Sequence, residues 1–297
     1  MVLVVGATGL VGGMITRRLL EQGRDVRILV RPNSHYQPLV AAGAKPVEGD
    51  LKDRSSLVAV CEGVDRLITT ASAGSRGGAD TPDSVDLQGN CHLIDAARAA
   101  GVQQFIFVST IGADEASPVP LLRAKAQAEE YLRRSGLTYT ILASHTLMDL
   151  LLRLVIGDPA RLGKPVTLVG EGRRQHSFVA ARDLAAFAAA VVGHPAALDR
   201  RLMIGGPRPV SLREVVSTYE QVLGRSIPIQ VAAPGELLPN LPPVPGLAEV
   251  VTSMVGALDM LDFPIDMAET ARTFDVRLTP LEEWVRADVA SDARVAA

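Results

Sequence analysis

The chain opens with an apolar run that leads directly into a glycine-rich segment, Val2-Leu3-Val4-Val5-Gly6-Ala7-Thr8-Gly9-Leu10-Val11-Gly12-Gly13. The unbroken apolar run predicts a buried strand, and residues 10–22 have helical spacing. The glycines at positions 6, 9 and 12 fall in the turn between these two elements. A strand, a glycine-rich turn and a helix in this order are typical of the first unit of a doubly wound α/β sheet.

Short runs rich in β-branched residues recur through the first half of the chain, and segments with helical spacing separate them. The expected strands are Val2–Val5, 25–30, Lys45–Glu48, 66–70, 104–108 and 138–142. The expected helices are 10–22, 57–61, 87–100 and 124–134. Strands that are apolar throughout and are joined by helices predict a parallel sheet covered on both faces. We therefore expect a Rossmann domain over residues 1–150.

Beyond about residue 150 this regular alternation stops. Proline-rich stretches at 159–165, 207–209 and 234–245 break the chain. Between and after them, the patterns predict a helix at 212–223, a strand at 227–231, a helical segment at 247–261 and a last helix through 281–285. We expect residues 151–297 to form a smaller, mostly α-helical lobe that returns in part to the Rossmann domain.

Composition and charge exclude several classes of function. The net charge is −3, from 30 basic and 33 acidic residues without a long run of either sign, which argues against nucleic acid and anionic membranes as partners. The first apolar run is too short for a signal peptide, and no later stretch is long enough to span a membrane. With only Cys61 and Cys91, we expect no disulfide framework and a cytoplasmic location. The expected partner is a small-molecule substrate. The sequence is compatible with a homo-oligomer and with a monomer.

The glycine-rich turn has the residues that a dinucleotide pyrophosphate requires. One glycine permits the tight turn, a second lets the backbone approach the phosphates, and a third allows the helix to pack closely on the strand. The free N–H groups at the helix N-terminus attract anions. The residues expected to hold the pyrophosphate are Gly6, Thr8, Gly9, Leu10, Val11 and Gly12.

The end of the second expected strand indicates which dinucleotide binds. NAD-preferring domains place a carboxylate there for the ribose hydroxyls. This chain instead has Arg31, followed by Ser34, and no acidic residue between them. A guanidinium and a hydroxyl suit a 2′-phosphate, so we expect NADPH as the cofactor. The alternative is that Arg31 is a solvated loop residue.

With these features assembled, the chain resembles the atypical short-chain dehydrogenases/reductases of the NmrA-like group. That group includes NADPH-dependent quinone reductases, isoflavone-reductase-like enzymes, and redox sensors or assembly proteins that bind the cofactor. The stretches that carry the resemblance are Gly6-Ala7-Thr8-Gly9, Leu29-Val30-Arg31, Gly49-Asp50-Leu51, Phe107-Val108-Ser109-Thr110, Lys125 with Glu129, Ser135-Gly136-Leu137-Thr138-Tyr139, and Gly205-Gly206-Pro207.

The resemblance implies further cofactor contacts at the ends of expected strands. It places Asp50 and Leu51 beside the adenine, and it places three residues beside the nicotinamide half of the cofactor, Thr70, Ala71 and Ser72. Asp50 has an alternative interpretation as a simple turn carboxylate.

The resemblance also implies that Ser109 and Lys125 face the nicotinamide ribose and the substrate, with Lys125 polarising a substrate oxygen. Many members of the wider superfamily use Tyr-x-x-x-Lys, in which the phenol donates a proton. Here Leu121 stands four residues before Lys125, so the phenol is missing. The alternatives are that Lys125 is a surface residue paired with Glu129 one turn later, and that Ser109 caps a strand end.

His145 follows the sixth expected strand and is a candidate proton donor, with a packed histidine as the alternative. His176 lies in a polar loop that is a second, weaker candidate for the pocket edge. The histidines lack metal-ligand spacing, so we expect no metal. The glycine-rich segment 73–79 is either a mobile cover for the nicotinamide or a plain connection.

Three functions fit these patterns. The first is an NADPH-dependent oxidoreductase that transfers hydride to a quinone, an activated alkene or a carbonyl. The second is an NADP(H)-binding redox sensor or assembly factor without turnover, which the missing phenol favours. The third is a sugar-nucleotide epimerase or dehydratase, and Leu121 argues against it because that chemistry also uses the tyrosine.

Overall fold

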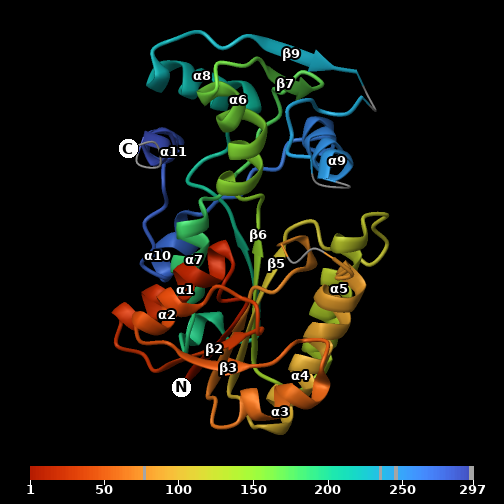
Figure 1. Ribbon diagram of the computed structural model, residues 1–297, viewed down its shortest axis with the longest axis vertical. Coiled ribbons are helices and arrows are strands. Elements are labelled where there is room, and N and C mark those ends of the chain that lie inside the picture. Colours follow the sequence, from red (N-terminus) through yellow and green to blue (C-terminus); the bar gives the residue numbers. More distant parts are fainter. Residues whose placement is uncertain (76–77, 234–235, 244–246, 294–297) are drawn as a thin grey trace. The chain divides into compact units, whose positions relative to one another are not determined.

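This computed structural model describes residues 1–75, 78–233, 236–243 and 247–293 (Figure 1). The chain divides into two compact units, each assembled from separate stretches of sequence. The first unit contains Met1–Ser144, Ala181–Met203 and Arg272–Val276. The second contains His145–Ala180, Ile204–Ala271 and Arg277–Ala297.

The first unit is built on a seven-stranded sheet with the strand order β3-β2-β1-β4-β5-β6-β8. The strands are β1 (Val2–Val5), β2 (Val26–Val30), β3 (Lys45–Glu48), β4 (Arg66–Thr69), β5 (Gln104–Thr110), β6 (Tyr139–Ser144) and β8 (Arg200–Ile204). All neighbouring pairs from β3 to β6 are parallel, and Val5 of β1 lies between Leu29 of β2 and Thr69 of β4. The chain therefore changes direction along the sheet beside β1, which is where a doubly wound fold binds its ligand. The predicted fold class is confirmed.

Helices cover both faces of this sheet. They are α1 (Leu10–Glu21), α2 (Gln37–Ala41), α3 (Arg54–Cys61), α4 (Asn90–Ala99), α5 (Pro120–Arg134) and α7 (Ala181–Ala190), with short helices η1 (Ala73–Ser75) and η4 (Pro195–Ala197). Helix α1 packs against α7 on one face, and α3, α4 and α5 lie on the other (Figure 1). The six expected strands of this sheet are all present within two residues of their predicted limits, whereas α3 and α5 begin three and four residues before theirs.

The prediction of one α-helix over residues 87–100 is wrong in the type of helix with which the segment begins. Residues 87–100 were predicted as a single helix, whereas the chain forms a π-helix, η2 (Pro82–Gly89), that continues into α4. The wider π turn is stabilised at its junction with α4 by Asn90, whose side-chain amide donates to the carbonyl oxygens of Val85 and Asp86 at 3.1 and 3.0 Å. Such widened turns are rare and occur frequently at functional sites.

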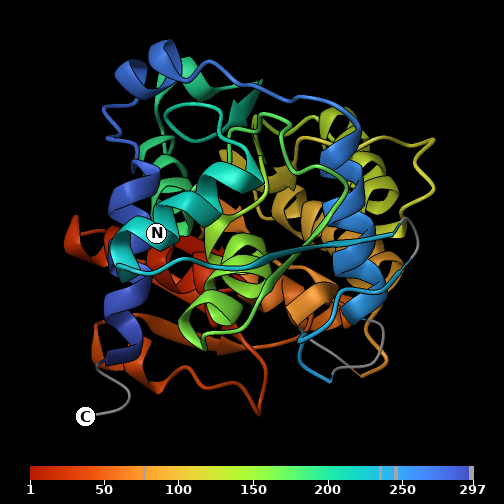
Figure 2. The same cartoon turned by 90° about the horizontal axis from the view of Figure 1, so that it is seen from above.

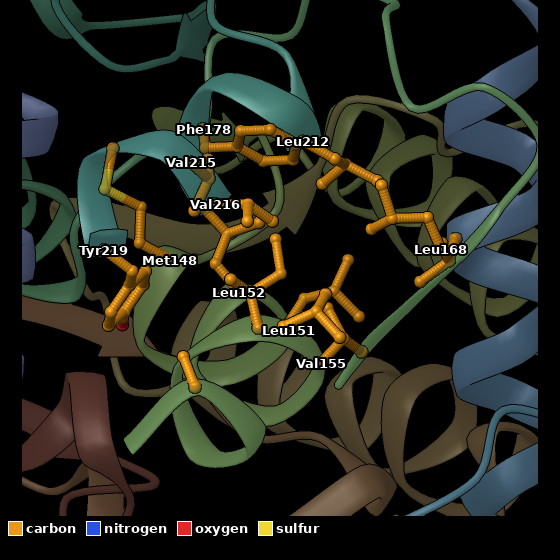
Figure 3. Close-up of a cluster of buried hydrophobic side chains, with 14 of the residues drawn as sticks. Met148, Leu151, Leu152, Val155, Leu168, Phe178, Leu212, Val215, Val216 and Tyr219 are labelled. Carbon is orange, nitrogen blue, oxygen red and sulfur yellow. The ribbon is translucent and has the colours of Figure 1, made fainter. Parts of the chain in front are cut away.

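The second unit is mostly helical. Its helices are the π-helix η3 (Met148–Gly157), α6 (Asp158–Arg161), α8 (Leu212–Leu223), α9 (Leu247–Met260), α10 (Ala268–Thr273, whose last residues belong to the first unit) and α11 (Leu281–Ala293). Helix α11 runs next to α8 (Figure 2). A two-stranded parallel sheet pairs β7 (Val166–Val169), which was not predicted, with β9 (Ile229–Ala232). Side chains of η3 and α8 form the core of this unit (Figure 3).

Candidate active site

The glycine-rich turn after β1 has three glycines with different surroundings. Gly6 has a φ of +83°, a conformation that favours glycine. A Cβ on Gly12 would lie 2.1 Å from the carbonyl oxygen of Gly6, so only glycine lets α1 approach the turn this closely. A Cβ on Gly9 would have a single neighbour within 4 Å, the Gly6 oxygen at 3.3 Å. Gly12 is therefore required for packing, whereas the space beside Gly9 is open for a ligand.

The N-terminus of α1 offers hydrogen-bond donors at this open side. Gly9 is the N-cap residue, and the first α-helical bond runs from the Gly13 N–H to the Gly9 carbonyl oxygen at 2.8 Å. The preceding N–H groups, those of Leu10, Val11 and Gly12, have no acceptor within the helix. These donors, the helix dipole and the cradle beside Gly9 fit a pyrophosphate. Thr8 and Leu10 are exposed there.

The end of β4 lies beside the glycine turn. The Thr70 hydroxyl donates weakly to the carbonyl oxygens of Val5 and Gly6, at 3.3 and 3.4 Å. Ala71 and Ser72 follow at the same carboxyl edge of the sheet. The structure thus brings Thr70 together with the predicted phosphate turn, and the predicted contacts of these residues with the nicotinamide half stay predictions.

Asp50 and Leu51 follow β3. One oxygen of Asp50 accepts the Lys52 N–H at 2.9 Å, so this carboxylate closes its own turn. The Leu51 side chain is 2% exposed and belongs to the hydrophobic core of the first unit. Contact of Leu51 with an adenine would therefore involve its main chain, and both adenine contacts stay predictions.

Arg31 follows β2, and its turn is closed by Ser34. The Ser34 hydroxyl accepts the Arg31 N–H at 3.0 Å and donates to the Arg31 carbonyl oxygen at 2.8 Å. The Arg31 side chain is 43% exposed, and its guanidinium lies 3.7 Å from the Asp80 carboxylate, which also binds the Lys52 ammonium at 2.5 Å. No acidic residue stands between Arg31 and Ser34 in the sequence, but the fold brings Asp80 to Arg31 from a segment 49 residues further along the chain.

Lys125 of α5 is buried, with only 6% of the residue exposed. Its ammonium lies 3.2 Å from one carboxylate oxygen of Asp86 and donates to the carbonyl oxygens of Ala71 and Val108, both at 3.3 Å. It also lies 4.8 Å from the centre of the Phe107 ring. The alternative of an exposed lysine paired with Glu129 is wrong, because Lys125 points into the first unit toward Asp86.

Asp86 is fully buried in η2 and connects Lys125 to the segment after β4. Its second carboxylate oxygen accepts the Ala73 N–H at 2.9 Å. The neighbouring Asn90 accepts a hydrogen bond from the Thr69 hydroxyl at 3.1 Å. A buried polar network thus fixes Lys125, η2 and the residues that follow Thr69 relative to one another.

Ser109 at the end of β5 is also buried, and its hydroxyl donates to Glu129 at 2.6 Å. Glu129, one turn after Lys125 on α5, is held by Arg133 at 2.8 Å and by Arg201 of β8 at 2.9 Å. Because the Ser109 proton is directed to Glu129, this hydroxyl can meet a cofactor or substrate only as an acceptor. Its predicted catalytic role stays a prediction.

His145 lies in the second unit and is 2% exposed. Its Nδ1 accepts the Thr146 N–H at 2.7 Å, which leaves the proton of the neutral ring on Nε2. Burial lowers the pKa of His145 to about 3, and the neighbouring His176 adds to this shift. The two imidazole rings are 5.5 Å apart, and Phe178 packs on both. His145 is therefore a packed, neutral histidine whose role as a proton donor stays a prediction.

Sequence reasoning missed the carboxylates Asp80 and Asp86, which hold the predicted basic residues. Neither carries a local signal, because each reaches its partner across more than 25 residues of sequence. Of the glycine-rich segment 73–79, residues 76–77 lie outside the described structure. Among the residues that the structure describes, no helix has both the length and the apolar character needed to cross a membrane.

Comparison with known proteins places this site in a family. Residues 6–195 match the family model described as NAD(P)H-binding. The chain is 30% identical over 229 residues to the NAD(P)H azoreductase of Xenophilus azovorans, a match that covers 76% of this chain and 75% of that protein. The chain belongs to the NAD(P)H-binding family and, within it, to the NmrA-like group of atypical short-chain dehydrogenases/reductases.

Two other similarities are to an assembly factor and to a solved reductase structure. The photosystem II assembly factor Ycf39 of Cyanophora paradoxa is 41% identical over 140 residues, which cover 47% of this chain and 43% of that protein. The structure of the NADPH-dependent quinone oxidoreductase QOR2 of Escherichia coli in complex with NADPH superposes with a TM-score of 0.79 and 22% identity, covering 97% of this chain and 99% of that one. The second similarity shows a shared fold.

Proposed function

We propose that this protein is an NADPH-dependent reductase that passes a hydride to a quinone, an activated alkene or a carbonyl group. The observation that carries the preference for NADPH is Arg31, a half-exposed guanidinium at the carboxyl end of β2, where NAD-preferring domains have a carboxylate. The azoreductase and the quinone oxidoreductase support reduction of a conjugated acceptor.

The residues of the chain bind and orient the reactants. The open turn beside Gly9 holds the pyrophosphate, and Arg31 attracts the 2′-phosphate. When bound, NADPH supplies the hydride. Lys125 stabilises the negative charge that develops on the substrate oxygen.

The hydrogen bonds of Lys125 to Ala71 and Val108 are 3.3 Å long, which is longer than the usual 2.9–3.0 Å, so one of them is weak enough to be exchanged for a substrate oxygen. Asp86 holds the ammonium in place during this exchange. His145, which belongs to the second unit, carries the proton of its neutral ring on Nε2 and is the alternative candidate for the proton donor.

The test is consumption of NADPH with a panel of quinones, enones and aldehydes, and calorimetric titration of NADPH in parallel. The double variant Lys125→Met/Asp86→Asn removes both buried charges and keeps the side-chain volumes. We expect turnover to fall about 100-fold, while affinity for NADPH stays within about threefold. Lys45→Met is the matched control, because Lys45 is an exposed lysine paired with Asp25, and it should keep full turnover. Retention of most turnover by the double variant would remove Lys125 from the mechanism.

The second candidate function is an NADP(H)-binding redox sensor or assembly factor without turnover. Two observations favour it: Leu121 occupies the position of the phenol, and Lys125 is already surrounded by Asp86 and two carbonyl oxygens. The similarity to an assembly factor agrees with this candidate. Tight NADPH binding without reduction of any compound in the panel would favour it over the reductase.

A further inference from the structure

Asp80 occupies the space between two cations at the carboxyl edge of β2 and β3. One of its oxygens lies 3.7 Å from Arg31, and the other lies 2.5 Å from the Lys52 ammonium. The Asp80 side chain is only 6% exposed, whereas those of Arg31 and Lys52 are 43% and 44% exposed. The carboxylate is thus fixed within the protein, and the two cations reach it from the solvent side.

Proteins recognise the 2′ position of the adenosine ribose with cations or with a carboxylate, and this site contains both. Cations favour the 2′-phosphate of NADPH, and a carboxylate accepts a hydrogen bond from the 2′-hydroxyl of NADH. Asp80 offsets part of the positive charge that would otherwise meet the phosphate. A fixed negative charge a few ångströms from a phosphate also repels it directly.

We propose that Asp80 is a specificity-determining residue that limits the preference for NADPH over NADH, and that Lys52 is a second cation, besides Arg31, for the 2′-phosphate. This inference rests on the proposed binding of NADPH and adds a residue that works against it. When NADPH binds, Arg31 and Lys52 turn from the carboxylate to the phosphate. When NADH binds, the carboxylate keeps both cations and accepts the ribose hydroxyl.

The half-exposure of both cations makes this exchange of partners possible. Arg31 and Lys52 are half-exposed, so solvent compensates their own charges when they turn from Asp80 to the phosphate. The main chain around them is fixed independently, because Ser34 closes the Arg31 turn and Asp50 closes the Lys52 turn. The side chains can therefore move while the site keeps its shape.

The experiment is calorimetric titration of the unmodified protein and three variants, Asp80→Asn, Asp83→Asn and Lys52→Met, with NADPH and NADH. Asp80→Asn removes the proposed negative charge. Asp83→Asn is the matched control, because it removes the same charge from the same segment, where Asp83 is hydrogen-bonded to Gln88 instead. The adenosine fragments 2′,5′-ADP and 5′-AMP, titrated in the same way, isolate the effect of the 2′-phosphate from the nicotinamide half.

We expect Asp80→Asn to bind NADPH and 2′,5′-ADP three- to tenfold more tightly, and to bind NADH and 5′-AMP no more tightly than the unmodified protein does, because the ribose hydroxyl loses its charged acceptor. Lys52→Met should weaken NADPH at least threefold and leave NADH unchanged, and Asp83→Asn should match the unmodified protein. Unchanged or weaker NADPH binding in Asp80→Asn would overturn the proposal and assign Asp80 to holding the cations in place. If the unmodified protein binds NADPH no more tightly than NADH, the result contradicts the proposed function itself. A failure of the Asp80 proposal alone would leave the preference of the unmodified protein for NADPH in place.

Discussion

The two basic residues that the sequence assigns to the cofactor site stand in opposite surroundings. Lys125 is almost completely buried, and its partner Asp86 is fully buried. Arg31 is half-exposed, and it shares its partner Asp80 with a second exposed cation, Lys52. The ion pair at Lys125 is a fixed part of the interior, whereas the one at Arg31 is a loose contact at the edge of the sheet.

This difference in burial gives the two cations different roles in the protein. Removing one member of a buried pair leaves a charge without compensation, so the pair must stay together to keep the protein folded. An exposed cation is solvated with or without its partner and can change partners at little cost. We therefore expect stability effects at Lys125 and binding effects at Arg31, and each prediction below tests that separation.

The largest effect should come from breaking the buried pair. Lys125→Met leaves the Asp86 carboxylate buried without its cation, and we expect the free energy of unfolding to fall by about 3 to 5 kcal/mol. Adding Asp86→Asn to the same chain should recover much of this loss. Lys45→Met is the matched control, because Lys45 and its partner Asp25 are both exposed, and it should change stability by less than about 1 kcal/mol. Urea unfolding measures all three, and equal effects at the two lysines would break the comparison.

A smaller effect separates packing from binding within the glycine turn. Gly9→Val places its side chain in the open space for the pyrophosphate, so we expect NADPH binding to fall at least about 100-fold, equivalent to about 2.7 kcal/mol, in a protein that stays folded. Gly12→Val should instead destabilise the fold, because its Cβ would overlap the Gly6 carbonyl oxygen. Circular dichroism and calorimetry distinguish the two outcomes. Normal NADPH binding by Gly9→Val would place the pyrophosphate elsewhere.

Most of the sheet was predictable because its strands are short, continuous apolar runs, as in Val2–Val5. Strand β8 was not predicted, since Arg200 and Arg201 interrupt any such run and its place next to β6 is set by contacts far apart in sequence. The π-helix η2 was missed for a related reason. It depends on the Asn90 side chain, and spacing alone does not distinguish it from the α-helix that follows.

The residues of the candidate site likewise fall into those that the local sequence predicts and those that it does not. The glycine turn was predictable because its function requires glycines at fixed spacing within one short segment. The partners of Arg31 and Lys125 were not, because Asp80 and Asp86 come from a different part of the chain and resemble any other aspartate in the sequence. Only the fold brings these carboxylates to the basic residues, and it excludes the alternative that Lys125 is an exposed residue paired with Glu129.

The smallest effect tests the central claim most directly, which is that Arg31 selects NADPH. Calorimetric titration of the unmodified protein with NADPH and with NADH should give at least a tenfold difference in Kd, equivalent to about 1.4 kcal/mol. Arg31→Asp should erase or reverse this difference while the free energy of unfolding stays nearly unchanged. Arg24→Asp makes the same change at an exposed position in the turn between α1 and β2 and should keep the tenfold preference. Equal affinities for the two cofactors in the unmodified protein would contradict the account.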